Sequence, residues 1–334
     1  MPTQLDSVIV GEPLFRYEAH DHWAQLPPGW SFNEVVGVAT DSRDRVFVFN
    51  RGEHPVIVFD REGKFLRSWG EGSIVRAHGI HIGPDDAVYL SDDLDHTVCK
   101  FTANGKLVQM LGTHGRASDT GCKNSDYRTI QRVAGPFNQP TNLALSPDGS
   151  MYITDGYGNA RVHKFSPDGG LILSWGEPGD GPGQFQLPHG IAVDRDARVY
   201  VADRENSRVQ IFDAAGKFIT EWRDLARPTE VFIDRNDTVY VSEIGFRCGL
   251  FPGVVAPPNA AGSSVAILSR DGKLLCRWGG GPDPCATGNF FAAHDVWADS
   301  HGDLYVSEVT MSAGGNRGAV PPTCHTLQKF VRTK

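Results

Sequence analysis

The 334-residue sequence predicts an all-β protein with the architecture of a six-bladed β-propeller. Three observations support this prediction: one segment recurs six times, apolar and polar residues alternate within each copy, and helical periodicity is absent. Residues 142–175 and 190–222 show the repeat most clearly. Each contains an apolar strand, an Asp/Gly turn, two alternating strands joined by a polar loop, and a last strand that ends in Trp. Six four-stranded units in a ring leave only short, protected sheet edges.

The whole chain, residues 1–334, is expected to form a single propeller domain. Its six blades are predicted to begin near residues 36, 78, 141, 189, 229 and 294. The last copy ends at LQKFVRTK, after three strands. We therefore expect the N-terminal segment within residues 1–30, around PLFRYEAHDHW, to supply the missing outer strand and close the ring.

Composition and charge disfavour several classes of protein. The chain contains 32 Lys and Arg against 40 Asp and Glu, a formal net charge of −8, which disfavours a nucleic-acid-binding surface. No apolar run is long enough for a membrane span, and the first residues, MPTQLDSVIVGEP, lack the pattern of a secretory signal. Six cysteines are scattered without CxxC spacing. A cytoplasmic protein with free thiols is therefore expected.

Histidine occupies one position of the repeat in alternate copies. Eleven residues before the aromatic residue of each second strand lie Val36, His78, Thr141, His189, Thr229 and His294. Equivalent positions of a closed ring lie on one circle around its axis, so these histidines are expected to converge in the channel. Three nitrogen ligands with an open fourth position are typical of catalytic zinc. The sequence therefore predicts a metal site, with zinc expected and iron, cobalt or manganese as alternatives.

Polar residues near the ends of the second strands predict the surroundings of this site. Fourteen residues after the histidine position lie Asn50, Asp92, Asp155, Asp203, Glu243 and Glu308, and an acid in five of six copies predicts a structural role in a turn. The residues that follow these acids differ between the copies, and they include Arg51, Tyr157 and Arg204. Such divergence is typical of residues added for function. A tyrosine near a metal can act as a base, and an arginine beside it can bind a carboxylate.

Three insertions, residues 112–139, 244–263 and 309–325, are expected to cover the face of the propeller that carries the histidines. We call these segments the roof loops. They are rich in Gly, Pro and Ala, which is typical of long ordered loops over a binding site. A covered channel favours a small substrate over a polymer.

Six segments of the chain can be compared with a known family: VGVATD…FNRGEH, HGIHI, QPTNLALSPDGSMYITDGYGNARV, GQFQLPHGIAV, VADRENSRVQIF and HDVWADSHGDLYVSE. Together they resemble peptidyl-α-hydroxyglycine α-amidating lyase, a six-bladed NHL-type propeller, and the resemblance extends from about residue 36 to 330. The resemblance implies a zinc triad of His78, His189 and His294. It also implies that Tyr157 is the base and that Arg51 and Arg204 are two active-site arginines. Finally, it implies a structural calcium that is bound by Asp295 and by the backbone carbonyls of Val38 and Ile80.

The resemblance also implies a reaction. The family splits an N-acyl carbinolamide, R–CO–NH–CH(OH)–COO⁻, into a primary amide and glyoxylate. We therefore expect a zinc-dependent carbon–nitrogen lyase that needs no redox cofactor, because an upstream oxygenase has already performed the oxidation.

Several positions depart from the family. Its two disulfides fall at Asn138 and Gly158 and at Tyr200 and Ile211, and a methionine beside its zinc is replaced by Ala292. The joint loss of both members of each disulfide fits a reducing cytoplasm. We expect a small carboxylate-bearing carbinolamide, or a related N,O-acetal formed during N-dealkylation, rather than a peptide.

Two alternative functions stay open. One is another metal-dependent propeller hydrolase, such as a lactonase or esterase of the gluconolactonase type; such enzymes use carboxylate and Asn ligands for calcium, so the three histidines disfavour it. The other is a non-enzymatic NHL module that binds RNA or protein through one face. The net charge of −8 and the covered channel disfavour RNA.

Overall fold

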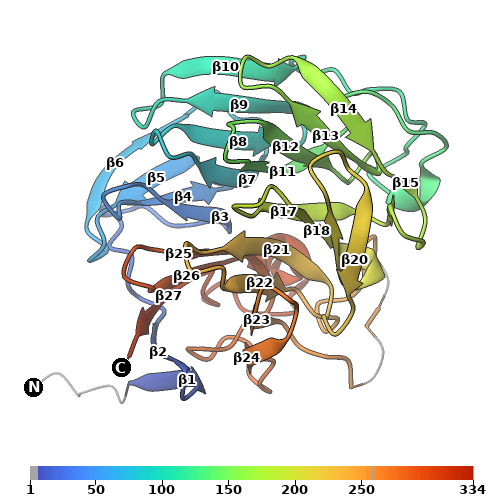
Figure 1. The fold of residues 1–334 in the computed structure, drawn as a ribbon. Coiled ribbons are helices and arrows are strands. Elements are labelled where there is room, and N and C mark those ends of the chain that lie inside the picture. The colour runs from blue at the N-terminus through green and yellow to red at the C-terminus, as the bar shows by residue number, and fades with distance from the viewer. Residues whose placement is uncertain (1–6, 254, 257–258, 334) are drawn as a thin grey trace, which may run out of the picture.

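The structure is a computed structural model that describes residues 7–253, 255–256 and 259–333. Within these ranges the chain forms six antiparallel sheets arranged around a central axis, which confirms the predicted six-bladed β-propeller (Figure 1). The inner strands of successive blades contact one another, and the inner strand of the last blade contacts that of the first. The six sheets therefore form a closed ring.

Each blade begins with its innermost strand. The first blade contains β3 (Val35–Thr40), β4 (Val46–Asn50), β5 (Val56–Phe59) and β6 (Phe65–Trp69), and the second contains β7 (Ala77–Ile82), β8 (Val88–Asp92), β9 (Thr97–Phe101) and β10 (Leu107–Gly112). The third contains β11 (Pro140–Leu145), β12 (Met151–Asp155), β13 (Arg161–Phe165) and β14 (Leu171–Trp175), and the fourth contains β17 (Pro188–Val193), β18 (Val199–Asp203), β19 (Arg208–Phe212) and β20 (Phe218–Trp222). The fifth contains β21 (Pro228–Ile233), β22 (Val239–Glu243), β23 (Ser264–Leu268) and β24 (Leu274–Gly279), and the sixth begins with β25 (Ala293–Ala298), β26 (Leu304–Glu308) and β27 (Leu327–Arg332).

The remaining elements are short. A two-stranded parallel sheet, β15 (Glu177–Pro178) and β16 (Gln184–Phe185), precedes the fourth blade. The helical turns are η1 (Tyr127–Thr129), η2 (Arg204–Asn206), α1 (Thr310–Ala313) and η3 (Gly315–Arg317). None of the helices in the described ranges is long and apolar enough to cross a membrane.

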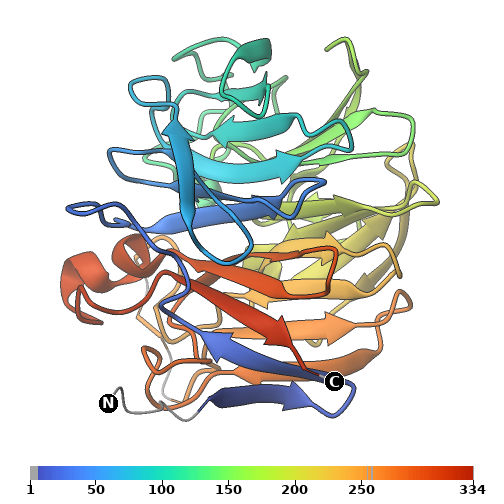
Figure 2. The same ribbon diagram turned by 90° about the vertical axis from the view of Figure 1, so that its left-hand side faces the viewer.

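The N-terminal segment completes the sixth blade. Strand β2 (Phe15–His20) pairs antiparallel with β27, with Ala19 opposite Phe330, so the predicted closure of the ring is confirmed. Strand β1 (Val8–Glu12) pairs with β2 and adds a fifth strand that the repeat did not predict. Figure 2 shows these blue strands beside the red C-terminal strand. Both ends of the chain therefore stabilise the same sheet.

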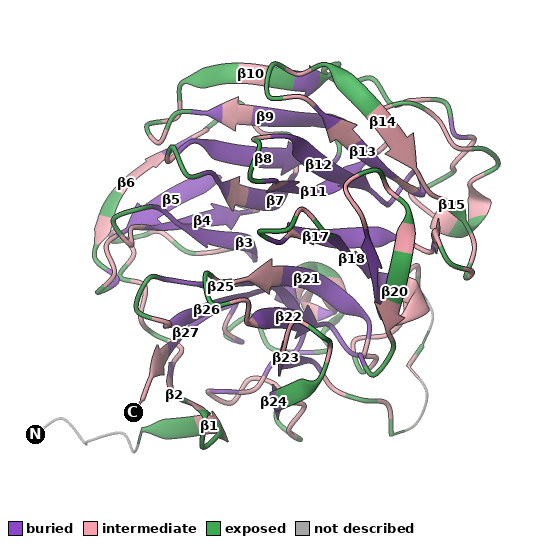
Figure 3. Ribbon diagram, in the orientation of Figure 1, coloured by how far each residue is buried: buried purple, intermediate pink, exposed green. Residues whose placement is uncertain are grey.

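Burial decreases from the inner to the outer strands of each blade (Figure 3). Adjacent blades pack through the Trp that ends an outer strand. Gly216 lies against Trp175 with φ +78°, and a Cβ at this glycine would lie 2.7 Å from the indole ring. Glycine is therefore favoured at this turn for two reasons: it adopts the left-handed backbone conformation, and it allows the adjacent blade to approach closely.

The acidic residues that end the second strands have the structural role predicted for them. In every blade, the side chain accepts a hydrogen bond from the backbone N–H of the residue seventeen positions earlier. The six acceptors are Asn50, Asp92, Asp155, Asp203, Glu243 and Glu308. These bonds fix the loop that enters each inner strand, and the inner strands bear the histidines.

The expectation of six free thiols is wrong for two cysteines. Cys285 and Cys324 form a disulfide, with Cα atoms 5.0 Å apart. The repeat gives no signal for this pair, because Cys285 lies in the connection between blades 5 and 6 and Cys324 lies in a roof loop. The predicted cytoplasmic location stays a prediction.

The positions of the two disulfides that the resemblance implies are adjacent in space. The backbone N–H of Gly158 donates to the carbonyl of Asn138 at 3.1 Å, and Tyr200 is the cross-strand partner of Ile211. A Cβ at Gly158 would lie 2.1 Å from the Asn138 side chain. The two residues of each pair are therefore neighbours here, but contacts other than a disulfide join them.

Candidate metal centre

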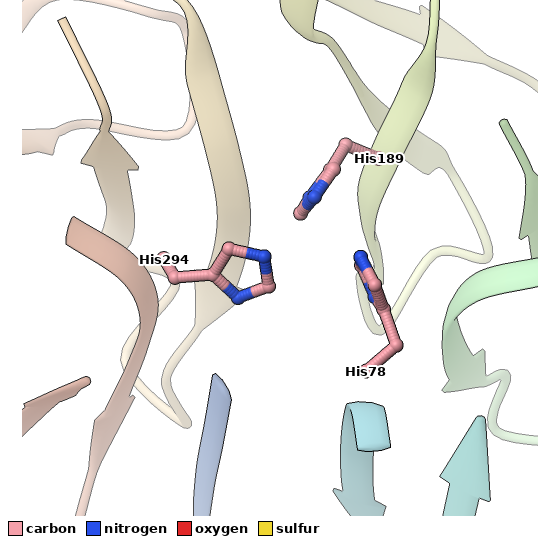
Figure 4. Close-up of side chains that lie close together, drawn as sticks. All are labelled: His78, His189 and His294. Atoms are coloured by element: carbon pink, nitrogen blue, oxygen red, sulfur yellow. The ribbon is translucent and has the colours of Figure 1, made fainter. Parts of the chain in front are cut away.

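Three histidine side chains meet on the axis of the propeller. His78, His189 and His294 are each the second residue of an inner strand, in β7, β17 and β25. All three are buried, and one ring nitrogen from each lies within 4.8 Å of the others. Figure 4 shows the three rings directed toward a common centre. The structure thus brings together the three residues that the repeat singles out.

The backbone of the intervening blades orients these rings. The Nδ1 atoms of His78, His189 and His294 lie 2.8, 2.7 and 2.7 Å from three carbonyl oxygens. These carbonyls belong to Thr141, Thr229 and Val36, the residues at the same repeat position in blades 3, 5 and 1. Because a carbonyl only accepts, each Nδ1 must carry the proton, which leaves a lone pair on each Nε2. All six copies of this position therefore contribute to the site.

Electrostatics keep the triad neutral. Burial, together with the neighbouring histidines and arginines, lowers the pKa of His78 and His189 well below the usual range, and burial with nearby Arg51 lowers the pKa of His294 to about 3. Neutral imidazoles with a hydrogen-bonded Nδ1 are the form that binds metals. The donor set and its orientation therefore fit a divalent metal with three nitrogen ligands.

Tyr157 and Arg204 lie directly beside the triad. The Tyr157 hydroxyl is 3.2 Å from Nε2 of His78 and 3.4 Å from Nε2 of His189, and it accepts a hydrogen bond from Nη1 of Arg204 at 3.3 Å. Both side chains are buried. This hydroxyl is therefore placed to exchange a proton with a group held next to the imidazoles.

Arg51 approaches the same space from the first blade. Its Nε donates to the carbonyl of Ala77 at 2.8 Å, and its Nη1 forms an ion pair with Glu34 at 2.8 Å. Glu34 also accepts a hydrogen bond from the backbone of Ser312, in a roof loop, at 2.7 Å. Arg51 is thus fixed next to His78, because Ala77 precedes that ligand in β7.

A cavity of about 760 Å³ lies over the triad. His294, Tyr157, Arg51 and Arg204 line its floor, and all three roof loops contribute to its walls. The ring of Phe251 packs 5.4 Å from that of Tyr157 and 5.5 Å from the Arg204 guanidinium. A cavity of this size accommodates a small molecule.

Two charged residues that the sequence did not single out hold Arg204. Glu205 accepts from Nε of Arg204 at 2.9 Å and from Nη2 of Arg227 at 2.7 Å, so one buried carboxylate pairs with two buried guanidinium groups. Arg227 also donates to the carbonyls of Gly245 and Gly249, both at 2.9 Å. Arg227 and Glu205 therefore link the roof loop 244–263 to Arg204, the arginine beside Tyr157. The repeat pattern gives no indication of this link.

A second set of polar side chains lies next to the triad in the channel. Asp295 accepts a hydrogen bond from the backbone N–H of Val38 at 3.0 Å, and burial raises the pKa of Asp295 to about 8. Asn142 and Glu230, which are hydrogen-bonded to each other, complete the set. These three residues line a narrow space together with the three histidines. Ile80, the remaining residue of the implied calcium site, lines a small cavity that also includes Asp295.

The repeat also marks Glu230, through the position that follows the histidine position. The position after the histidine position holds Asn142, Glu230 and Asp295 in three blades and glycine in the other three. A Cβ at Gly79 would lie 2.6 Å from the Asn142 side chain, and one at Gly190 would lie 3.0 Å from that of Glu230. Gly79 and Gly190 therefore make room for the polar residues of the next blade.

Comparisons with known proteins show what the chain is similar to. The family model of the NHL repeat matches residues 185–212. NHL repeat-containing protein 3 of Mus musculus is 34% identical over 230 residues, which cover 63% of this chain and 60% of that protein. Peptidyl-α-hydroxyglycine α-amidating lyase 1 of Drosophila melanogaster is 32% identical over 207 residues, which cover 58% of this chain and 36% of that protein. The chain thus spans less than two thirds of the length of either relative.

A solved structure shares the fold. The gluconolactonase from Xanthomonas campestris superimposes with a TM-score of 0.60 at 14% identity, over 96% of this chain and 90% of that chain. At this identity the likeness concerns the fold alone. The chain is a six-bladed β-propeller with an NHL repeat at residues 185–212, and the proteins similar to it include the peptidyl-α-hydroxyglycine α-amidating lyases.

Proposed function

We propose that this protein is a zinc-dependent lyase that cleaves the C–N bond of an N-acyl-α-hydroxyglycine-type carbinolamide to an amide and glyoxylate. The observation that supports it most is the position of the Tyr157 hydroxyl, within 3.4 Å of two triad nitrogens and of the Arg204 guanidinium. An acid–base group and a cation for a carboxylate thus line one small cavity together with His294, and the other two histidines lie next to the Tyr157 hydroxyl. The similarity to amidating lyases supports the same reaction class.

The proposed reaction needs one proton to move between two atoms of the substrate. Tyr157 accepts the proton of the carbinol hydroxyl; the C–O bond becomes a carbonyl, the C–N bond breaks, and its electron pair goes to nitrogen. Tyr157 then returns the proton to that nitrogen, which yields R–CO–NH₂ and OHC–COO⁻. Arg204 and Arg51 bind the carboxylate and fix the hydroxyl next to Tyr157. A metal held by His78, His189 and His294 would supply Lewis-acid stabilisation of the developing oxyanion.

We also propose that the substrate is a small carboxylate-bearing metabolite and that an oxygenase supplies it by hydroxylating the carbon next to nitrogen. We further propose calcium as a structural ion bound by Asp295 with the backbone carbonyls of Val38 and Ile80. The buried Asp295 carboxylate in the channel supports this assignment.

Substitutions at the triad and at Tyr157 test the proposed function by separating chemistry from metal binding. Glyoxylate release from α-hydroxyhippurate is measured together with zinc content. Tyr157→Phe should lower kcat by about 10²- to 10⁴-fold and retain the metal, because it removes only the acid–base group. His189→Ala should lose both activity and metal, and Tyr152→Phe, which removes a hydroxyl that bonds the Ala214 carbonyl away from the cavity, should keep both. Equal metal loss in the Tyr157 and His189 variants would contradict the assigned base.

Two alternatives predict different results. A propeller hydrolase, suggested by the gluconolactonase-like fold, would hydrolyse lactones or esters with calcium and release no glyoxylate. A non-enzymatic binding module, compatible with the similarity to NHL repeat-containing protein 3, would keep its function in His189→Ala.

A further inference from the structure

The cavity above the triad is strongly cationic, although the protein as a whole is acidic. Six arginines line it: Arg51, Arg76, Arg204, Arg227, Arg247 and Arg317. Among the described residues that line the cavity there is no Asp or Glu, while the whole chain has a net charge of −8. The positive charge is therefore concentrated where a substrate would bind.

Carboxylates behind the cavity wall neutralise only part of this charge. Glu34 pairs with Arg51 at 2.8 Å, and Asp93 pairs with Arg76 at 3.0 Å. Glu205 is shared by two arginines, as described above. Six guanidinium groups thus face three carboxylates, and three positive charges remain without a partner.

Arg247 and Arg317 account for two of these charges. Arg247 donates to the carbonyls of Ala260 and Gly281, and Arg317 donates to those of Ser312 and Ala313. In the part of the chain that the structure describes, neither forms an ion pair with a carboxylate. Their backbone contacts fix the two guanidinium groups at the cavity while leaving other N–H groups of each free to bind an anion.

The two residues belong to different roof loops and lie farther out than the arginine beside Tyr157. Arg247 and Arg317 are exposed, whereas Arg204 is buried with 4% of its side chain exposed. A single carboxylate at Arg204 and Arg51 would therefore leave the outer pair without a counterion. The cavity volume of about 760 Å³ leaves room for a longer substrate that reaches from one set to the other.

We infer that the substrate carries a second anionic group, on its acyl portion, which Arg247 and Arg317 bind. This inference rests on the proposed function and specifies its substrate class: an N-acyl-α-hydroxyglycine whose acyl chain ends in a carboxylate or a phosphate-type group. Guanidinium groups bind either anion well. A neutral acyl chain of the same length is a poorer substrate.

Substrates of matched length test the inference. N-succinyl-α-hydroxyglycine ends in a carboxylate, N-succinamoyl-α-hydroxyglycine ends in a neutral amide, and the N-phosphonoacetyl compound distinguishes phosphonate from carboxylate. The succinyl compound should exceed the succinamoyl compound in kcat/KM by about 30-fold, the size expected for one charge-assisted hydrogen bond. The phosphonoacetyl compound should exceed the succinyl compound if phosphate is the natural group, and fall below it if carboxylate is.

Variants locate the second subsite. Arg247→Gln with Arg317→Gln should reduce the succinyl preference to near one, mainly through KM. The control, Arg43→Gln with Arg198→Gln, removes the same charge from turns that lie outside the cavity lining, and it should keep the full preference. A wild-type preference near one, or a preference that survives the Arg247/Arg317 substitutions, would overturn the inference.

A binding measurement separates this inference from the proposed reaction. Calorimetry compares succinate with succinamate on zinc-loaded protein, without any turnover. Tighter binding of succinate that the Arg247/Arg317 variant loses supports the anion subsite even if no compound releases glyoxylate. Equal binding of the two acids refutes the subsite even if glyoxylate is released.

Discussion

Removing the disulfide between Cys285 and Cys324 should destabilise the protein by a predictable amount. The bond closes a loop of 39 residues, which contains the whole of β25 and β26 and most of the roof loop 309–325. In the chain-entropy model, a loop of this length contributes about 4 kcal/mol by restricting the unfolded chain. The unfolding entropy of a 334-residue chain is about 0.7 kcal/mol per kelvin, so the melting temperature should fall by about 6 °C.

Differential scanning calorimetry of Cys324→Ser tests this value. Cys122→Ser is the control, because Cys122 is a partly buried cysteine that forms no disulfide. Reductant should lower the melting temperature of the wild type and of Cys122→Ser equally and should not affect Cys324→Ser. A melting temperature of Cys324→Ser equal to that of the oxidised wild type would refute the reasoning, since a bond that closes this loop cannot be lost without effect.

Two further predictions concern the triad. In Gly79→Ala, the new Cβ would lie 2.4 Å from the Thr141 carbonyl that orients His78, so the affinity for zinc should fall by about 10- to 100-fold. The control is Gly135→Ala, which has no atom within 4 Å of its new Cβ and should bind zinc normally. Equal zinc affinities of the two variants would show that the Thr141 carbonyl does not matter for metal binding. In metal-free protein, the triad has pKa values lowered in the folded state, so below about pH 6.5 the unfolded chain binds more protons than the folded one. Stability should therefore fall as the pH falls below 6.5, by up to about 4 kcal/mol per pH unit for three histidines. Denaturant titrations at pH 7.5, 6.5 and 5.5 measure the total slope, to which other buried groups such as His81 and Asp295 also contribute. His189→Gln should lower this slope by about 1.4 kcal/mol per pH unit, the contribution of one histidine, and an identical slope in that variant would contradict the prediction.

Much of the fold and the centre of the site follow from the sequence because they obey the repeat. The period places His78, His189 and His294 on alternate inner strands, and the ring geometry then brings them together. The missing outer strand of the last blade predicts the pairing of β2 with β27 for the same reason. A repeat determines both the position of each residue around the axis and the number of strands that a complete blade needs.

Features that depend on the insertions do not follow from the repeat. The pairing of Cys285 with Cys324 joins two loops that have no counterpart in other blades. The contacts of Arg227 with Glu205 and with the carbonyls of Gly245 and Gly249 depend on the conformation of one roof loop. Long-range contacts of this kind are determined by the folded shape of each loop, so local pattern alone could not predict them.

The most direct test of the proposed lyase is metal-dependent glyoxylate release. Zinc-loaded and chelator-treated protein are compared on α-hydroxyhippurate, with zinc content measured in the same samples. We expect glyoxylate from protein with one zinc per chain, loss of activity after chelation, and recovery when zinc is restored. Glyoxylate release that is unchanged by chelation, or none from protein that holds one zinc per chain, would contradict the proposed reaction at the triad.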